Sequence, residues 1–340
     1  MPEESLDTPP AGGRRGWIWL GVFWIVVLLG FGGAGITLAI LGPPVTEEAP
    51  VLAVAPVEQP PPPPPAPRGV PESLSRYLDP TLVEFAAVGA LPRIGPDGSM
   101  PMRVYARPFD RQDTRPRVAL ILGGVGLRAS LSEEAIRTLP RNIALAFTPY
   151  APNPAPLIEA ARDRDFETLL ALPMEPTGFP MNDPGHRALL TTLSAGENAQ
   201  RLDWLLARFP GHVGAVGAIA SMRGERFAAM AEPFAQMQLA LNARGLLYFD
   251  VRPGAPHPER VWGFTVDVVV DEPHTRGEIE QRLAQLERLA RERGSALGYL
   301  GEVTPVALER LIAWTGGLDA RGVALAPVTA LVRRPEIATR

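Results

Sequence analysis

The sequence predicts an α/β protein whose parallel sheet is covered by helices, joined through a proline-rich linker to one membrane-spanning helix. Three observations in the chain of 340 residues lead to this prediction. Short apolar runs alternate with segments of helical period throughout residues 73–340. A long uncharged apolar stretch precedes them near the N-terminus. A dense group of the 39 prolines separates the two regions.

The apolar stretch at residues 16–42 is predicted to be a transmembrane helix. It contains no charged residue, and a helix of about 20 apolar residues crosses the hydrocarbon core of a bilayer. Arg14 and Arg15 precede it, so the positive-inside rule places residues 1–15 in the cytoplasm and the remainder of the chain outside it. A cleaved signal peptide is the alternative, but the apolar region is too long for one.

Residues 43–72 are predicted to be an extended linker. They show neither helical nor strand period, and Pro60 to Pro65 form an uninterrupted run. Such a run adopts polyproline II, which rises about 3 Å per residue. The linker would hold the following domain away from the bilayer. A recognition site for a partner protein is the alternative use of such a sequence.

The domain at residues 73–340 alternates apolar runs with helical segments. The runs predicted to be buried strands are 118–122, 143–147, 167–172, 213–219, 246–251, 266–270, 296–300 and 323–328. The clearest helical segments are 201–209, 225–245, 278–294 and 305–318, with Gly294 as a C-cap. Both a barrel and an open, doubly wound sheet satisfy this pattern, and periodicity does not choose between them.

Composition excludes several classes of function. The net charge of −4 gives no global positive field, so we expect no nucleic-acid partner. All basic residues are arginines, which rules out Schiff-base chemistry and a P-loop. Without cysteine there is no thiol nucleophile and no cysteine-bound metal. The four histidines show no spacing typical of a metal site.

Polar side chains at the carboxyl ends of the predicted strands are the candidate site residues, because parallel α/β folds gather their functional groups there. Glu175 follows the run at 167–172 and stands between two prolines. Asp250 and Arg252 stand at and just beyond the end of the run at 246–251. A buried aspartate must be paired or functional, so this pair is either a site or a structural ion pair.

Several motifs, in a fixed order along the chain, resemble the divergent polysaccharide deacetylase family of bacterial envelope proteins. They include YARPFD in residues 105–110, LPMEP in 172–176, DPG followed by ALL in 183–190, and YLGEVTP in 299–305. The resemblance covers roughly residues 80–335. It implies a distorted (β/α)7-type barrel. It also implies a site in which zinc, held by one aspartate and two histidines, activates water with the help of a second aspartate.

The chain departs from that pattern at the site itself. Gly123 and Gly124 stand where relatives carry the two aspartates. Ser221 stands in place of one histidine, and Glu302 in place of the late histidine. Glycine has no side chain with which to bind a metal or to act as a base. We therefore expect no bound zinc unless other residues rebuild the site, for instance around a hard cation such as magnesium or calcium.

Three readings of the function follow. In the first, the domain lies in the periplasm and is anchored in the bacterial inner membrane through residues 16–42. It has lost deacetylase activity and binds envelope polysaccharide, peptidoglycan or an envelope protein. The residues expected to bind substrate are Tyr150, Glu175, Asp183, Asp250 and Arg252. In the second, the domain is an active metal-dependent deacetylase with rearranged ligands. Its candidate catalytic residues are Asp250, Glu302 and Glu175. A third reading makes the linker the docking site of a partner.

Overall fold

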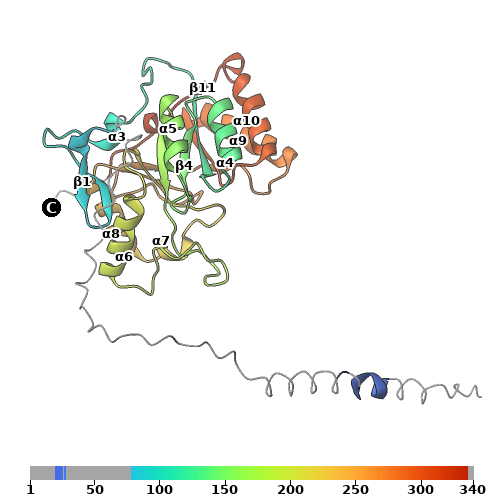
Figure 1. Cartoon of the computed structure of the whole chain (residues 1–340). Helices are drawn as coiled ribbons and strands as arrows, with labels where there is room; N and C mark the ends of the chain where they lie inside the picture. Colours follow the sequence, from blue (N-terminus) through green and yellow to red (C-terminus); the bar gives the residue numbers. More distant parts are fainter. Residues whose placement is uncertain (1–19, 26, 28–77, 336–340) are drawn as a thin grey trace, which may run out of the picture. The chain divides into compact units, whose positions relative to one another are not determined.

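The computed structural model describes residues 20–25, 27 and 78–335 of the chain. Residues 20–25 and 27 are helical. The remainder of the predicted transmembrane segment, the tail at 1–15 and the linker at 43–72 lie outside the described residues. Within the described ranges, no helix combines the length and the apolar character that crossing a bilayer requires. Residues 78–335 belong to a compact unit that runs from Pro63 to Arg340, and the fold described below is that of this unit (Figure 1).

The centre of this unit is a curled sheet of parallel strands. Its strands along the chain are β3 (Arg117–Val125), β4 (Ala144–Phe147), β5 (Thr168–Ala171), β6 (Gly214–Val216), β7 (Leu247–Asp250), β8 (Gly263–Thr265), β9 (Val268–Val269), β10 (Ser295–Leu300) and β11 (Ala324–Leu325). They are ordered β8-β7-β6-β5-β4-β3-β10-β9, and the short β11 also pairs with β3. Each predicted apolar run therefore contains at least part of one strand.

One continuous segment joins the two ends of this sheet. β8 and β9 stand at opposite ends of the strand order, yet only Val266 and Asp267 separate them in the chain. The amide of Val266 donates to the carbonyl of Asp250 in β7 at 2.8 Å. The amide of Asp267 donates to the carbonyl of Leu297 in β10 at 2.9 Å. The segment thus pairs with β7 on one side and with β10 on the other. This curled parallel sheet agrees with the barrel type of fold that the resemblance implies.

The two faces of the sheet belong to separate apolar clusters, as the alternation of side chains along a strand requires. In β3, Val118 and Leu120 pack in the cluster between the sheet and the helices. Ala119 and Ile121 pack in the second cluster, together with Tyr299 of β10. All five side chains are buried. The inside of the curled sheet is therefore filled with side chains.

The helices cover the outer face of the sheet (Figure 1). They are α4 (Ala129–Thr138), α5 (Ala155–Asp163), α6 (Ala195–Leu206), α7 (Glu225–Ala228), α8 (Ala231–Ala243), α9 (Arg276–Arg293) and α10 (Pro305–Gly316). Local sequence explains where several of them begin and end. Ser194 and Glu197 form a capping box at the start of α6. Gly294 ends α9 with a left-handed φ of 83°, which confirms the predicted C-cap.

Two elements differ from the sequence-based expectation. The helix predicted over residues 225–245 is divided into α7 and α8, with Met230 in an extended conformation between them. Pro233 explains the division, because a proline inside a continuous helix lacks the amide hydrogen and clashes with the preceding turn. The sequence also gave no sign of the antiparallel hairpin formed by β1 (Val83–Ala86) and β2 (Gly89–Pro92), which precedes the short helix α3 (Pro101–Val104).

Candidate functional site

Three chain segments meet at the carboxyl ends of the strands. A side-chain carbon on Gly123, in β3, would lie 3.0 Å from the carbonyl oxygens of Leu300 and Gly301. A side-chain carbon on Gly301 would lie 2.8 Å from the carbonyl oxygen of Ala220, in the loop after β6. The ends of β3 and β10 and the loop after β6 therefore approach one another closely. We call this region the mouth of the sheet.

The phenol of Tyr299 fills the space beside Gly123. Its hydroxyl oxygen is 2.7 Å from the place that a side-chain carbon on Gly123 would take. The same hydroxyl donates to the carbonyl of Ala220 at 3.3 Å. Burial raises the pKa of Tyr299 above its ordinary value, so the group at this position is a neutral phenol. An aspartate at position 123 would require the phenol or the neighbouring backbone to move.

The four positions that correspond to the family's site do come together. A side-chain carbon on Gly124 would lie 3.3 Å from the Cα atom of Glu302. Ser221 is exposed and directly follows Ala220, whose carbonyl contacts Tyr299. Gly124 has a left-handed φ of 69°, a conformation that strains any residue with a side chain. The fold therefore brings these four positions near one another, and glycine, serine and glutamate occupy them.

Asp271 is a mouth residue that was not among the predicted catalytic or substrate-binding residues. It follows β9 and is almost completely buried. One of its carboxylate oxygens, Oδ2, accepts from the amides of Gly301 at 2.8 Å and Glu302 at 3.1 Å, and lies 3.7 Å from Nδ1 of His274. Burial raises the pKa of Asp271, and the two amide hydrogen bonds oppose that rise. The sequence carried a signal for it, since Asp271 ends an apolar strand just as Asp250 does.

Arg223 connects two loops of the mouth. Its guanidinium lies 3.1 Å from the carboxylate of Glu272, which follows Asp271. It also lies 3.5 Å from the carboxylate of Glu225 at the start of α7. The loop after β6 and the loop after β9 are thereby tied together by charge. Arg223 was not among the predicted site residues, because an arginine in a polar loop gives no signal by itself.

Glu175 is buried, and neighbouring groups lie against both of its carboxylate oxygens. Its side chain has no exposed surface and lies 3.0 Å from Nε of Arg226. Its other carboxylate oxygen accepts from the amide of Thr191 at 2.5 Å and from the hydroxyl of Thr191 at 2.7 Å. The carboxylate thus fastens the loop after β5 to the chain around residue 191. Such an environment favours a structural role over proton transfer to a ligand.

Asp250 forms a two-pronged ion pair with Arg252. Nε and Nη2 of Arg252 lie 2.9 and 2.5 Å from the two carboxylate oxygens of Asp250. Only 3% of the Asp250 side chain is exposed, against 22% for Arg252. The guanidinium also lies over the ring of Phe234. Of the two readings left open for this strand end, the geometry favours the structural ion pair.

Tyr150 and Asp183 lie in a separate group. The Tyr150 hydroxyl accepts from the amide of Arg187 at 3.3 Å, and its ring lies against that of His186. Asp183 accepts from the amide of Gly185 in the same loop. Burial raises the pKa of Tyr150. The predicted substrate-binding residues therefore fall into three local groups, built around Tyr150, Glu175 and Asp250.

The donor set at the mouth does not fit the zinc site that the resemblance implies. Of the four corresponding positions, only Glu302 carries a carboxylate and none carries an imidazole. Throughout residues 78–335, no three histidine, aspartate or glutamate side chains are grouped so that they could hold a metal ion. The carboxylates of Glu175 and Asp250, which a rebuilt site would need, are each paired with an arginine. No metal-dependent step can be derived from this arrangement.

Comparison with known protein families shows which family the chain belongs to. The sequence model described as "Divergent polysaccharide deacetylase" matches residues 120–332, more than half of the chain. The chain belongs to the divergent polysaccharide deacetylase family. The matched residues begin within β3 and end just beyond β11, so they include every part of the mouth.

Two solved structures are similar to this chain. The crystal structure of an uncharacterized protein from Agrobacterium tumefaciens C58 is 30% identical, with a TM-score of 0.65. The match covers 72% of this chain and 99% of the other. The catalytic domain of a peptidoglycan N-acetylglucosamine deacetylase from Eubacterium rectale matches at 12% identity and a TM-score of 0.42, covering 69% and 97% of the two chains. Among curated proteins, no sequence matches significantly.

Proposed function

We propose that this chain is an envelope protein whose periplasmic domain binds an N-acetylated polysaccharide, such as peptidoglycan, without removing its acetyl groups. Membership of the polysaccharide deacetylase family supports the class of ligand. The uncharged stretch at residues 16–42 and the arginines before it support a single-pass anchor in the bacterial inner membrane. The linker at 43–72 would give the domain reach toward the polysaccharide.

The contact between Tyr299 and Gly123 is the observation that most directly supports the absence of deacetylase activity. Water attack on an amide needs a group that polarises the carbonyl and a base that takes a proton from the water. In this chain a neutral phenol lies where the first aspartate of the family would extend, and Gly124 cannot supply the second carboxylate. The remaining groups at the mouth can form hydrogen bonds with sugar hydroxyl and acetamido groups.

The alternative function is a deacetylase with rearranged ligands. The observation that favours it is the pair of Asp271 and His274 at the mouth, where Nδ1 of His274 lies 3.7 Å from Oδ2 of Asp271. An imidazole beside a carboxylate is a common acid–base pair. Against this reading, Asp271 uses its Oδ2 atom to bind two backbone amides, and it is buried.

Retention on purified peptidoglycan separates these functions. A fragment of residues 63–340 is mixed with sacculi, with sacculi stripped chemically of N-acetyl groups, and with cellulose as an unrelated glycan. We expect retention on native sacculi only, weakened in Arg223→Gln at the mouth and unchanged in Arg137→Gln, which alters an exposed arginine of α4. Retention equal to that of an unrelated protein would contradict the proposal. Acetate release that is lost in Glu302→Gln would support the deacetylase instead.

A further inference from the structure

A cavity of about 880 Å³ lies at the opposite end of the sheet from the mouth. Its lining includes Leu247 at the start of β7, Arg117 at the start of β3, and Trp262 just before β8. Because these residues precede or begin their strands, the cavity lies at the amino ends of the strands. None of the residues of the mouth contributes to it. We call it the lower cavity.

Four arginines line the lower cavity: Arg103, Arg107, Arg111 and Arg117. Its lining contains no aspartate or glutamate, although the chain as a whole has a net charge of −4. Arg103 and Arg111 are exposed, so their guanidinium groups are available to a ligand. Like charges gathered in this way repel one another, and a bound anion would relieve that repulsion.

The two remaining arginines are held in place by neighbouring groups. Nε of Arg107 donates to the side-chain oxygen of Asn142 at 2.9 Å, and the guanidinium of Arg117 lies 5.3 Å from the centre of the Phe109 ring. Burial and the positive charge of Arg141 lower the pKa of Arg107, and the negative charges of Asp165 and Glu167 oppose that fall. These contacts fix the orientation of two cations before any ligand arrives, which reduces the entropy lost on binding.

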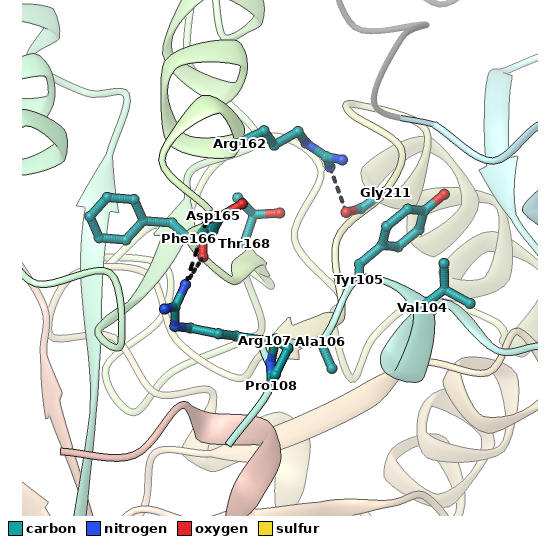
Figure 2. A pocket seen from close by; sticks show the side chains of 10 residues that line it. All are labelled: Val104, Tyr105, Ala106, Arg107, Pro108, Arg162, Asp165, Phe166, Thr168 and Gly211. Carbon is teal, nitrogen blue, oxygen red and sulfur yellow. Dashed lines mark hydrogen bonds and ion pairs between the residues drawn. The ribbon is translucent and has the colours of Figure 1, made fainter. Parts of the chain in front are cut away.

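A second basic cavity adjoins the first. Figure 2 shows this cavity of about 470 Å³, which shares Ala106, Arg107 and Pro108 with the lower cavity. Arg162 extends into it and donates to the carbonyl oxygens of Pro210 and Gly211, at 3.0 and 2.5 Å. Burial lowers the pKa of Arg162 to about 10, so it remains charged at neutral pH. The same lining contains Asp165, whose carboxylate lies 3.9 Å from Nη1 of Arg107, so two arginines and one aspartate leave one net positive charge in this cavity.

We propose that the lower cavity binds a phosphate group. Guanidinium groups donate paired hydrogen bonds to phosphate oxygens, which makes arginine the usual side chain for this task. The lining also includes Met102, Phe109 and Trp262, so the ligand can carry an apolar portion beside its phosphate. A soluble phosphate ester and the headgroup of an anionic phospholipid share this chemistry. The site is independent of the mouth and of its proposed ligand.

The path of the chain is compatible with both a soluble phosphate ester and a phospholipid headgroup as the ligand. Leu78, where the described domain begins, lies beside Gly211: its Cδ2 atom is 2.6 Å from the place that a side-chain carbon there would take. Gly211 also lines the second basic cavity. The chain therefore enters the domain beside the second cavity, while the mouth is at the other end.

Two binding assays with the fragment of residues 63–340, which has its own core, test the proposal and identify the source. The first measures the affinity for inorganic phosphate by calorimetry at constant ionic strength. The second measures sedimentation with vesicles of phosphatidylcholine, alone or mixed with phosphatidylglycerol. Binding in both assays assigns the site to the phosphate group itself. Binding only to the mixed vesicles assigns it to a lipid headgroup, and binding only to inorganic phosphate assigns it to a soluble ester.

Paired variants show whether the lower cavity is responsible. Arg103→Gln combined with Arg111→Gln removes two exposed charges and should weaken binding by about tenfold or more. Arg276→Gln combined with Arg288→Gln removes two charges from the exposed side of α9 and should leave the binding affinity nearly unchanged. No binding in either assay, or equal weakening by the two pairs of substitutions, would overturn the proposal.

Discussion

The hydroxyl of Tyr299 lies against Gly123 at the mouth of the sheet, 2.7 Å from where a side-chain carbon would extend. Gly123→Ala should therefore lower the free energy of unfolding by about 1–3 kcal/mol, the usual cost of overpacking. The same substitution in a Tyr299→Phe background should cost less, because the hydroxyl is gone and only the backbone contacts remain. Urea unfolding of the four combinations measures this difference.

Gly277 provides the control for this comparison. It lies in α9, and nothing within 4 Å would meet an added side-chain carbon there. Gly277→Ala should leave the stability unchanged or raise it by up to about 1 kcal/mol, since alanine favours helix. If Gly123→Ala costs as much with phenylalanine at position 299 as with tyrosine, the phenol is not what fills the site.

The ion pair between Asp250 and Arg252 should be structural. Arg252→Gln leaves a buried carboxylate without its partner, which typically costs about 3–5 kcal/mol. Replacing both residues, by Asn and Gln, should cost less than replacing Arg252 alone. The exposed pair of Arg276 and Glu309 is the matched control, where loss of the arginine should cost no more than about 1 kcal/mol. A double variant less stable than Arg252→Gln would contradict this role.

His212 should make the domain sensitive to acid. It is fully buried, and burial lowers the pKa of its imidazole from 6.5 to about 4. As the pH falls from 6.5 toward 4, the unfolded chain takes up a proton before the folded chain does, so the free energy of unfolding decreases. Between pH 7 and pH 5 the loss should be on the order of 2 kcal/mol.

Replacing His212 isolates this contribution. His212→Phe removes the hydrogen bond to the carbonyl of Gly214, so it should lower stability at pH 7. It should nevertheless reduce the further loss between pH 7 and pH 5, as measured by urea unfolding at each pH. An unchanged pH dependence in His212→Phe would mean that the imidazole has the same pKa in the folded and the unfolded chain, so that its burial is not linked to acid stability.

Asp271 should act mainly as an acceptor for the end of β10. Asp271→Ala leaves the amides of Gly301 and Glu302 without their acceptor, and a buried amide without a partner costs about 1–3 kcal/mol. Asp271→Asn keeps a carbonyl oxygen in place and should cost clearly less in a thermal or urea unfolding assay. If both substitutions are equally damaging, the negative charge itself is required at this position.

The strand–helix alternation was sufficient to predict the α/β class and the position of most strands. It could not predict how the sheet curls, because the pairing of Val266 with β7 and of Asp267 with β10 depends on hydrogen bonds between residues far apart in sequence. The helix at 225–245 was predicted without its interruption, although Pro233 indicated one.

The candidate site was predicted only in part. The family motifs led to Gly123, Gly124, Ser221 and Glu302, which the fold brings together. The sequence could not show that Glu175 is paired with Arg226, because the two side chains meet only through the fold. Tyr299 was missed for a related reason, since its place in an apolar strand hides the direction in which its hydroxyl points.

Metal content tests most directly the claim that the mouth no longer holds a hydrolytic centre. The fragment of residues 63–340, purified without chelator and then exposed to zinc, manganese, magnesium or calcium, is dialysed and examined by elemental analysis. We predict far less than one metal ion per chain, and no change in Asp271→Asn or Glu302→Gln. Nearly one ion per chain that disappears in either variant would contradict the account and indicate a rebuilt deacetylase site.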